Sequence, residues 1–258
     1  MKTAILLLLA AVRVQDQEPV PTLVDPPVHT STPAQLLTRV FMRYMTAERL
    51  TAKITLKVTT GMGDSGVMDT IIQYEKPSLV YIKQSQGSEN KYIISDGKMF
   101  TYPRPPYVHG DSSQFIEPVV NHGFPLDTRD IYGVGAVALL DRSIPLDILM
   151  GRAVDVKQAA TCWIDLRDAG TVDYNGVVAR RIVGRWRPEP TGDEAGKYEI
   201  LIDEKTLSLL HYKVQQMISP ADQKGRILTP TTYTSDYSIT SDTTSPVDRS
   251  LFKFSFGG

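Results

Sequence analysis

The stretch from Thr70 to Pro103 reads TIIQYEKPSLVYIKQSQGSENKYIISDGKMFTYP, and it decides the fold class. Aliphatic and aromatic residues alternate with polar ones in four short runs, which is the period-two pattern of half-buried β-strands. Pro77, residues 87–90 and Asp96–Gly97 separate the runs, and connections this short join antiparallel neighbours. The strand-forming side chains include no catalytic grouping. The stretch therefore predicts antiparallel sheet and favours binding over catalysis.

Further helices and strands are predicted on both sides of this stretch. Before it, an amphipathic helix is predicted over 33–45 and an alternating strand over 54–58. After it, helices are predicted over 128–140 and 143–150, and strands follow over 161–256. About ten or eleven strands with two or three helices predict an α+β fold. We expect a strongly curved antiparallel sheet, an incomplete β-barrel, with helices packed in or over its concave face.

The chain is predicted to have three parts. Residues 1–14 combine one lysine with an apolar run, as a secretory signal peptide does, and the run is too short to span a bilayer. Residues 15–32 are proline-rich and suit an extended spacer. Residues 33–258 show no composition break and are predicted to form a single domain. We therefore expect a periplasmic protein.

Composition and motifs argue against several kinds of partner and cofactor. The formal net charge is -1 and the pI is about 6.4, so no excess of positive charge favours nucleic acid. The single cysteine, Cys162, excludes a disulfide within the chain. The histidines lack the spacing that places two on one helix face, so neither a metal site nor another cofactor is expected. They are His29, His109, His122 and His211.

One glycine-rich segment matches two well-known catalytic and cofactor-binding patterns. Gly61–Gly66 fits both GxGxxG and the Gly-Asp-Ser-Gly surroundings of a serine-protease nucleophile. A dinucleotide loop must open a helix, whereas a strand follows here. A protease triad in that order needs an upstream histidine, and His29 in the spacer is the single candidate. The segment is therefore interpreted as a hairpin loop, with no catalytic residues, and the protein is not expected to be an enzyme.

Apolar side chains of the strands and of residues 128–150 are the candidates for binding a ligand. Each of these side chains could equally belong to a fully packed core, so only a subset is expected to line a ligand cavity. Arg180–Arg181, with Arg185 and Arg187, either bind an anionic headgroup at a cavity rim or form a solvent-facing edge. The apolar candidates are Tyr74, Leu79, Tyr81, Phe100, Tyr102, Leu139, Ile148, Leu149, Trp163 and Trp186.

Several short strings resemble the LolA-like family of periplasmic lipoprotein carriers, in particular its branch of outer-membrane lipoprotein-sorting-like proteins. They are AQLLTRVFMRYM (34–45), YEKPSL (74–79), ISDGK (94–98), IPLDILMG (144–151) and IDEKTL (202–207). The resemblance covers residues 33 to 256 and implies an incomplete β-barrel that shelters acyl chains, with 144–151 as a short lid helix. Carriers of that family have an arginine just after the proline-bounded strand start, proposed to hold the lid shut. Here Val80, Tyr81 and Ile82 follow Leu79, so the resemblance does not extend to that arginine.

Three hypotheses of function follow. The first is an exported, non-enzymatic monomer that holds a lipid or lipoprotein acyl chain between sheet and helices. Release would require residues 128–150 to move, with Gly133, Gly135 and Gly151 as flexible points. The second is an envelope sensor on the same scaffold, similar to the sigma-factor regulators that resemble RseB, with an envelope protein as its partner. The third, ranked last, is an exported hydrolase whose site is assembled from loops.

Overall fold

The computed structural model describes residues 31–61, 63, 65–105, 114–121, 123–152, 163–187, 196–218 and 230–253. The predicted signal peptide, the spacer up to residue 30 and Cys162 lie outside these ranges, as do His29, His109 and His122. No helix in the described ranges combines the length and hydrophobicity that crossing a bilayer requires.

The first half of the sheet is a meander of strands that follow one another in the chain. The four strands predicted over 70–103 are confirmed as β2 to β5, and each pairs with the next in antiparallel register. Short turns join them because glycine at Gly87 and Gly97 adopts the positive φ that these turns require. The strands are β1 (Arg49–Thr60), β2 (Ser65–Glu75), β3 (Leu79–Gln86), β4 (Glu89–Asp96), β5 (Met99–Pro103) and β6 (Gln114–Pro118).

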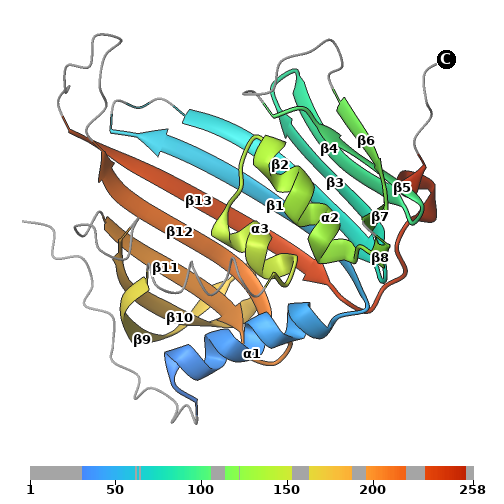
Figure 1. Ribbon diagram of the computed structural model, residues 1–258. Coiled ribbons are helices and arrows are strands. Elements are labelled where there is room, and N and C mark those ends of the chain that lie inside the picture. The colour runs from blue at the N-terminus through green and yellow to red at the C-terminus, as the bar shows by residue number, and fades with distance from the viewer. Residues whose placement is uncertain are drawn as a thin grey trace, which may run out of the picture.

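The second half is a similar meander, and β1 pairs with β13 to join the two. The result is one eleven-stranded sheet in the order β6-β5-β4-β3-β2-β1-β13-β12-β11-β10-β9. Within the described part of the chain, β6 and β9 have no outer neighbour, so the curved sheet is not closed (Figure 1). This confirms the predicted α+β fold with an incomplete barrel. The strands are β9 (Trp163–Tyr174), β10 (Val177–Trp186), β11 (Gly196–Asp203), β12 (Ser208–Ile218) and β13 (Thr231–Asp242), and β7 (Val120–Asn121) pairs separately with β8 (Phe124–Pro125).

Helices lie across one face of the sheet, as Figure 1 shows. They are α1 (Pro33–Thr46), α2 (Thr128–Gly135), which continues as the short 3₁₀ helix η1 (Ala136–Ala138), and α3 (Ile144–Leu149). The start of α1 is set by a capping box, in which Thr32 accepts from the Gln35 amide and the Gln35 side chain accepts from the Thr32 amide. Asp127 and Asp130 form the same arrangement at the start of α2.

The main core lies between these helices and the sheet. Leu36, Val40 and Tyr44 of α1 are buried there, together with alternate residues of the strands such as Ile72 and Ile82. The prediction that strands continue to residue 256 is wrong at residues 249–252, which form the 3₁₀ helix η2 (Arg249–Phe252). This helix contacts β3 and β4.

Candidate ligand-binding site

Side chains do not completely fill the space between helices and sheet. A cavity of about 210 Å³ lies between α1, α3, β9 and β12. Its two polar side-chain groups already have partners, since the Thr38 hydroxyl donates to the carbonyl of Ala34 and the Trp163 indole donates to the Tyr212 hydroxyl. The cavity therefore offers an apolar surface. Its lining residues are Ala34, Leu37, Thr38, Val40, Phe41, Ile148, Trp163, Leu166 and Leu209.

The cavity opens beside the first turns of α1. Ala34 and Thr38 line it and are also exposed to solvent, whereas Leu209 on β12 is fully buried at its inner end. A chain-like ligand entering there would place its apolar end against Leu209 and its other end in water. This geometry suits an amphipathic molecule.

A buried arginine fixes the segment that leads into α1. Arg180 on β10 is 2% exposed, and its guanidinium donates to the carbonyl oxygen of Ser31 at 2.7 Å. It also pairs with Asp168 and Glu204, each at 2.8 Å. Burial alone would lower the pKa of Arg180, but its hydrogen bonds to the two carboxylates outweigh this and raise it. Arg180 therefore stays charged and holds the start of α1 against the sheet. Both roles predicted for Arg180 are therefore wrong, because this buried residue lies neither at a cavity rim nor on a solvent-facing edge.

Tyrosines fix the other end of α1. The Tyr44 hydroxyl accepts from the amide of Leu209 at 3.1 Å and bonds to the Ser241 hydroxyl at 2.8 Å. The Tyr74 hydroxyl donates to the carbonyl of Tyr44 at 3.1 Å. Burial raises the pKa of Tyr74, so this hydroxyl remains a donor at neutral pH. With both ends of α1 anchored, one wall of the cavity has a defined position.

The region predicted as a lid is bonded to the sheet by a different residue from the expected arginine. Gln84 on β3 is fully buried and makes two hydrogen bonds to the backbone of Asp141, one to its carbonyl at 2.7 Å and one from its amide at 3.0 Å. The Tyr132 hydroxyl on α2 donates to Asp147 on α3 at 2.6 Å. These contacts fasten α2, α3 and their connection to the sheet.

Glycines in this region serve close packing. A Cβ on Gly135 would lie 2.6 Å from Cδ1 of Ile93, so glycine lets α2 approach β4 closely. Gly151 has a φ of 65° and a Cβ there would lie 2.7 Å from the Cα of Met45. The end of α3 can therefore meet the end of α1 because residue 151 lacks a side chain.

The structure brings two of the predicted ligand-binding residues, Ile148 and Trp163, to the cavity. Tyr74, Phe100, Tyr102 and Leu149 are buried in the core, and Leu139 and Trp186 pack partly buried against it. Leu79 and Tyr81 belong to neither group. They alternate with Val80 and Ile82, which face the core, and so lie on the other face of β3.

Sequence reasoning missed most of the lining. Five of its residues lie on α1, and Leu166 and Leu209 lie on β9 and β12. The available signal was the apolar stripe of residues 33–45, which is wider than the face that contacts the sheet.

No family model matches the sequence, and no curated protein matches it. Several solved structures are similar in fold. MucB is 14% identical with a TM-score of 0.43 over 86% of this chain, and a chain of the Pseudomonas aeruginosa MucA/MucB complex is 14% identical with a TM-score of 0.41 over 85%. This chain spans 62% and 60% of those two chains.

Two further structures match over most of both chains. LprF from Mycobacterium bovis is 12% identical with a TM-score of 0.38, and the match covers 81% of this chain and 91% of that one. A LolA superfamily protein from Nitrosomonas europaea is 6% identical with a TM-score of 0.29, covering 87% of this chain and 98% of that one. At these identities and TM-scores the matches concern similarity of fold alone.

Proposed function

We propose that the protein is an exported, non-enzymatic binder of an apolar ligand, a lipid or lipoprotein acyl chain, held in the cavity between α1, α3, β9 and β12. The observation that carries this proposal is the lining of that cavity, which is apolar and has its two polar groups already bonded within the protein. The signal-like pattern of residues 1–14 supports export to the periplasm.

The size of the cavity limits how much of a ligand it holds. By comparison with the ~150 Å³ cavity that binds benzene, about 210 Å³ is room for on the order of eight carbon atoms. Burying that many methylenes offers roughly 6 kcal/mol gross at about 0.8 kcal/mol each, before the costs of association. The rest of a longer acyl chain would pass out beside Ala34 and Thr38, unless α1 moves away from the sheet.

A series of saturated fatty acids of increasing length tests the proposal. Their affinity is measured by displacement of a fluorescent fatty acid from the purified protein. We expect about a fourfold gain per methylene up to about eight carbons, followed by a weaker dependence on length. Absence of any binding across the series, together with no lipid extracted from protein purified from its native envelope, would refute the proposal.

A matched pair of variants shows whether binding occurs in this cavity. Leu166→Trp adds bulk to the cavity wall on β9, and Val172→Trp places the same side chain on an exposed part of the same strand. Leu166→Trp should weaken binding at least about tenfold, because it takes up space that the ligand needs. Val172→Trp should bind like the unmodified protein. Equal affinities for the two variants would place the ligand elsewhere.

A partner-binding role of the sensor type is the second candidate, because apolar side chains are exposed near the β6 edge of the sheet. Phe124 is 75% exposed, and Val120 and Ile116 are 52% and 46% exposed. Clustered exposed apolar residues are typical of protein interaction sites. Affinity capture from solubilised envelope, with Phe124→Ser compared against Val178→Ser, tests it. Stoichiometric recovery of a membrane protein that depends on Phe124 alone would favour the sensor.

A further inference from the structure

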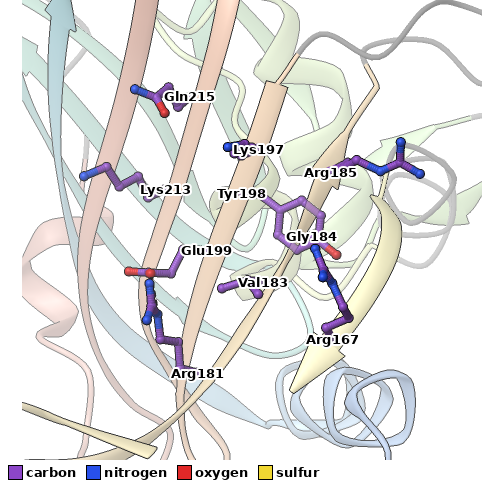
Figure 2. Close-up of a pocket in the computed structure, with 10 residues that line it drawn as sticks. All are labelled: Arg167, Arg181, Val183, Gly184, Arg185, Lys197, Tyr198, Glu199, Lys213 and Gln215. Atoms are coloured by element: carbon purple, nitrogen blue, oxygen red, sulfur yellow. Dashed lines mark hydrogen bonds and ion pairs between the residues drawn. The ribbon is translucent and has the colours of Figure 1, made fainter. Parts of the chain in front are cut away.

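A groove of about 440 Å³ lies on the face of β9 to β12 opposite to the helices. Arg181 and Arg185 come from β10, Lys197 from β11, Lys213 from β12 and Arg167 from β9. These residues alternate along their strands with core residues such as Ile182 and Tyr212, which places them on the other face. Figure 2 shows them around the groove, with Glu199 beside Arg181. The groove is therefore separate from the apolar cavity.

The tip of the β9–β10 hairpin bends over this face and makes it concave. The ring of Tyr174, the last residue of β9, lies tilted against that of His211 on β12, with 5.5 Å between the ring centroids. Its hydroxyl also donates to the Ser238 hydroxyl on β13 at 3.2 Å. Because β10, β11 and β12 separate β9 from β13 in the sheet order, the hairpin must fold back across the surface. Arg167 on the same strand pairs with Val183 of β10, and both residues line the groove.

The lining is strongly basic. It contains five cationic side chains and one carboxylate, Glu199, whereas the whole chain has a formal charge of -1. Glu199 pairs with Arg181 at 2.6 Å, and two neighbouring carboxylates pair with Arg185 and Lys213. Even with those carboxylates counted, two positive charges remain in excess. Arg167 and Lys197 have no ion pair among the described residues.

Two of the cations are placed where they repel each other. Arg185 and Lys197 are direct cross-strand partners on the same face of β10 and β11. Like charges in this position oppose sheet formation, and although Arg185 pairs with Asp165, Lys197 has no ion pair among the described residues. A bound anion would supply the counter-charge that Lys197 lacks. Gln215, the cross-strand partner of Lys197 on β12, adds an amide donor to the same row.

We propose that this groove binds an anionic phosphate group, supplied either by a soluble phosphate compound or by a phospholipid headgroup. Arginine presents a fork of donors that matches phosphate oxygens, and lysine adds a mobile point charge. The proposal does not depend on the apolar cavity, which lies on the other face of the sheet.

Two probes distinguish the two sources of phosphate. Inorganic pyrophosphate, titrated calorimetrically into the full chain, tests a soluble ligand. Cosedimentation with phosphatidylglycerol vesicles, compared with phosphatidylcholine vesicles, tests a headgroup. The test variant is Arg167→Gln with Lys197→Gln, which removes the two cations without ion pairs, and the control is Lys53→Gln with Lys57→Gln on exposed positions of β1.

We expect saturable binding to at least one probe, weakened by added salt. The test variant should lose at least about tenfold in affinity, and the control should lose less than about twofold. If the test variant loses pyrophosphate binding, a soluble ligand is supported. If it loses only the binding to the anionic vesicles, a headgroup is supported. Binding to neither probe, or equal effects in the test and control variants, would overturn the proposal.

Discussion

Leu36 and Leu37 are adjacent leucines of α1 with different surroundings, and replacing each by alanine tests the cavity directly. Leu36 is 0% exposed within the core, and Leu37 is 8% exposed and lines the cavity. Either change removes about three methylene equivalents, or roughly 2.4 kcal/mol of burial. Leu36→Ala also opens a new void, so it should cost about 3–5 kcal/mol. Leu37→Ala extends a void that is already present, and about 2–3 kcal/mol is expected.

The same two variants should separate in ligand binding. Leu37→Ala enlarges the cavity by about three carbon atoms, so the chain length at which fatty-acid affinity levels off should rise from about eight to about eleven carbons. Leu36→Ala should leave that length unchanged. Urea unfolding and the fatty-acid displacement series measure the two effects. Equal losses of stability with the same levelling-off length in both variants would show that Leu37 does not border a ligand site.

Three further predictions concern polar contacts. Gln84→Leu should cost about 1–3 kcal/mol, because it leaves the Asp141 amide and carbonyl without their partner, and hydrogen exchange at that amide should accelerate. Burial raises the pKa of Asp141 above its ordinary value of 3.8, so the folded protein holds this proton more tightly than the unfolded chain does. The resulting contribution of Asp141 to folding stability is fully present below pH 3.8 and is lost as the pH rises through the raised pKa. Asp141→Asn should therefore be more stable than the unmodified protein at pH 7, with no difference below about pH 3.8 in urea unfolding. Arg180→Met should cost about 1–3 kcal/mol, less than for a fully buried pair because Asp168 and Glu204 are about one-third exposed, and unfolding at two salt concentrations checks it.

Local pattern accounts for the strands of 70–103 but not for which face of each strand is buried. Val80, Tyr81 and Ile82 are all apolar, so alternation does not tell which of them faces the core. The helix η2, from the far end of the chain, contacts β3 and β4, so the outer face of these strands is not simply a solvent face. That contact has no local signal in the sequence, which therefore does not separate Leu79 and Tyr81 from the core residues Val80 and Ile82.

The cavity was only partly predictable for a similar reason. The stripe on α1 indicates that the helix is buried, and Leu36 and Tyr44 do contact the core. Whether the neighbouring Leu37 and Phe41 meet side chains or a cavity depends on how far β9 and β12 stand from the helix. Helix periodicity contains no information about that separation. Ile148 was predicted as a ligand contact because its helix was expected to cover the sheet, and it does line the cavity.

The pairing of β1 with β13 has a consequence for how the chain folds. Every other pairing in the large sheet joins strands that are consecutive within one of the two meanders, β1–β6 or β9–β13. The β1–β13 pairing, from Thr51 with Asp242 to Thr60 with Tyr233, joins opposite ends of the chain. Contacts between such distant residues form slowly, because the intervening chain must be ordered first. Until β13 arrives, β1 presents an unpaired edge, so a chain synthesised or translocated from its N-terminus is most exposed to aggregation just before β13 emerges.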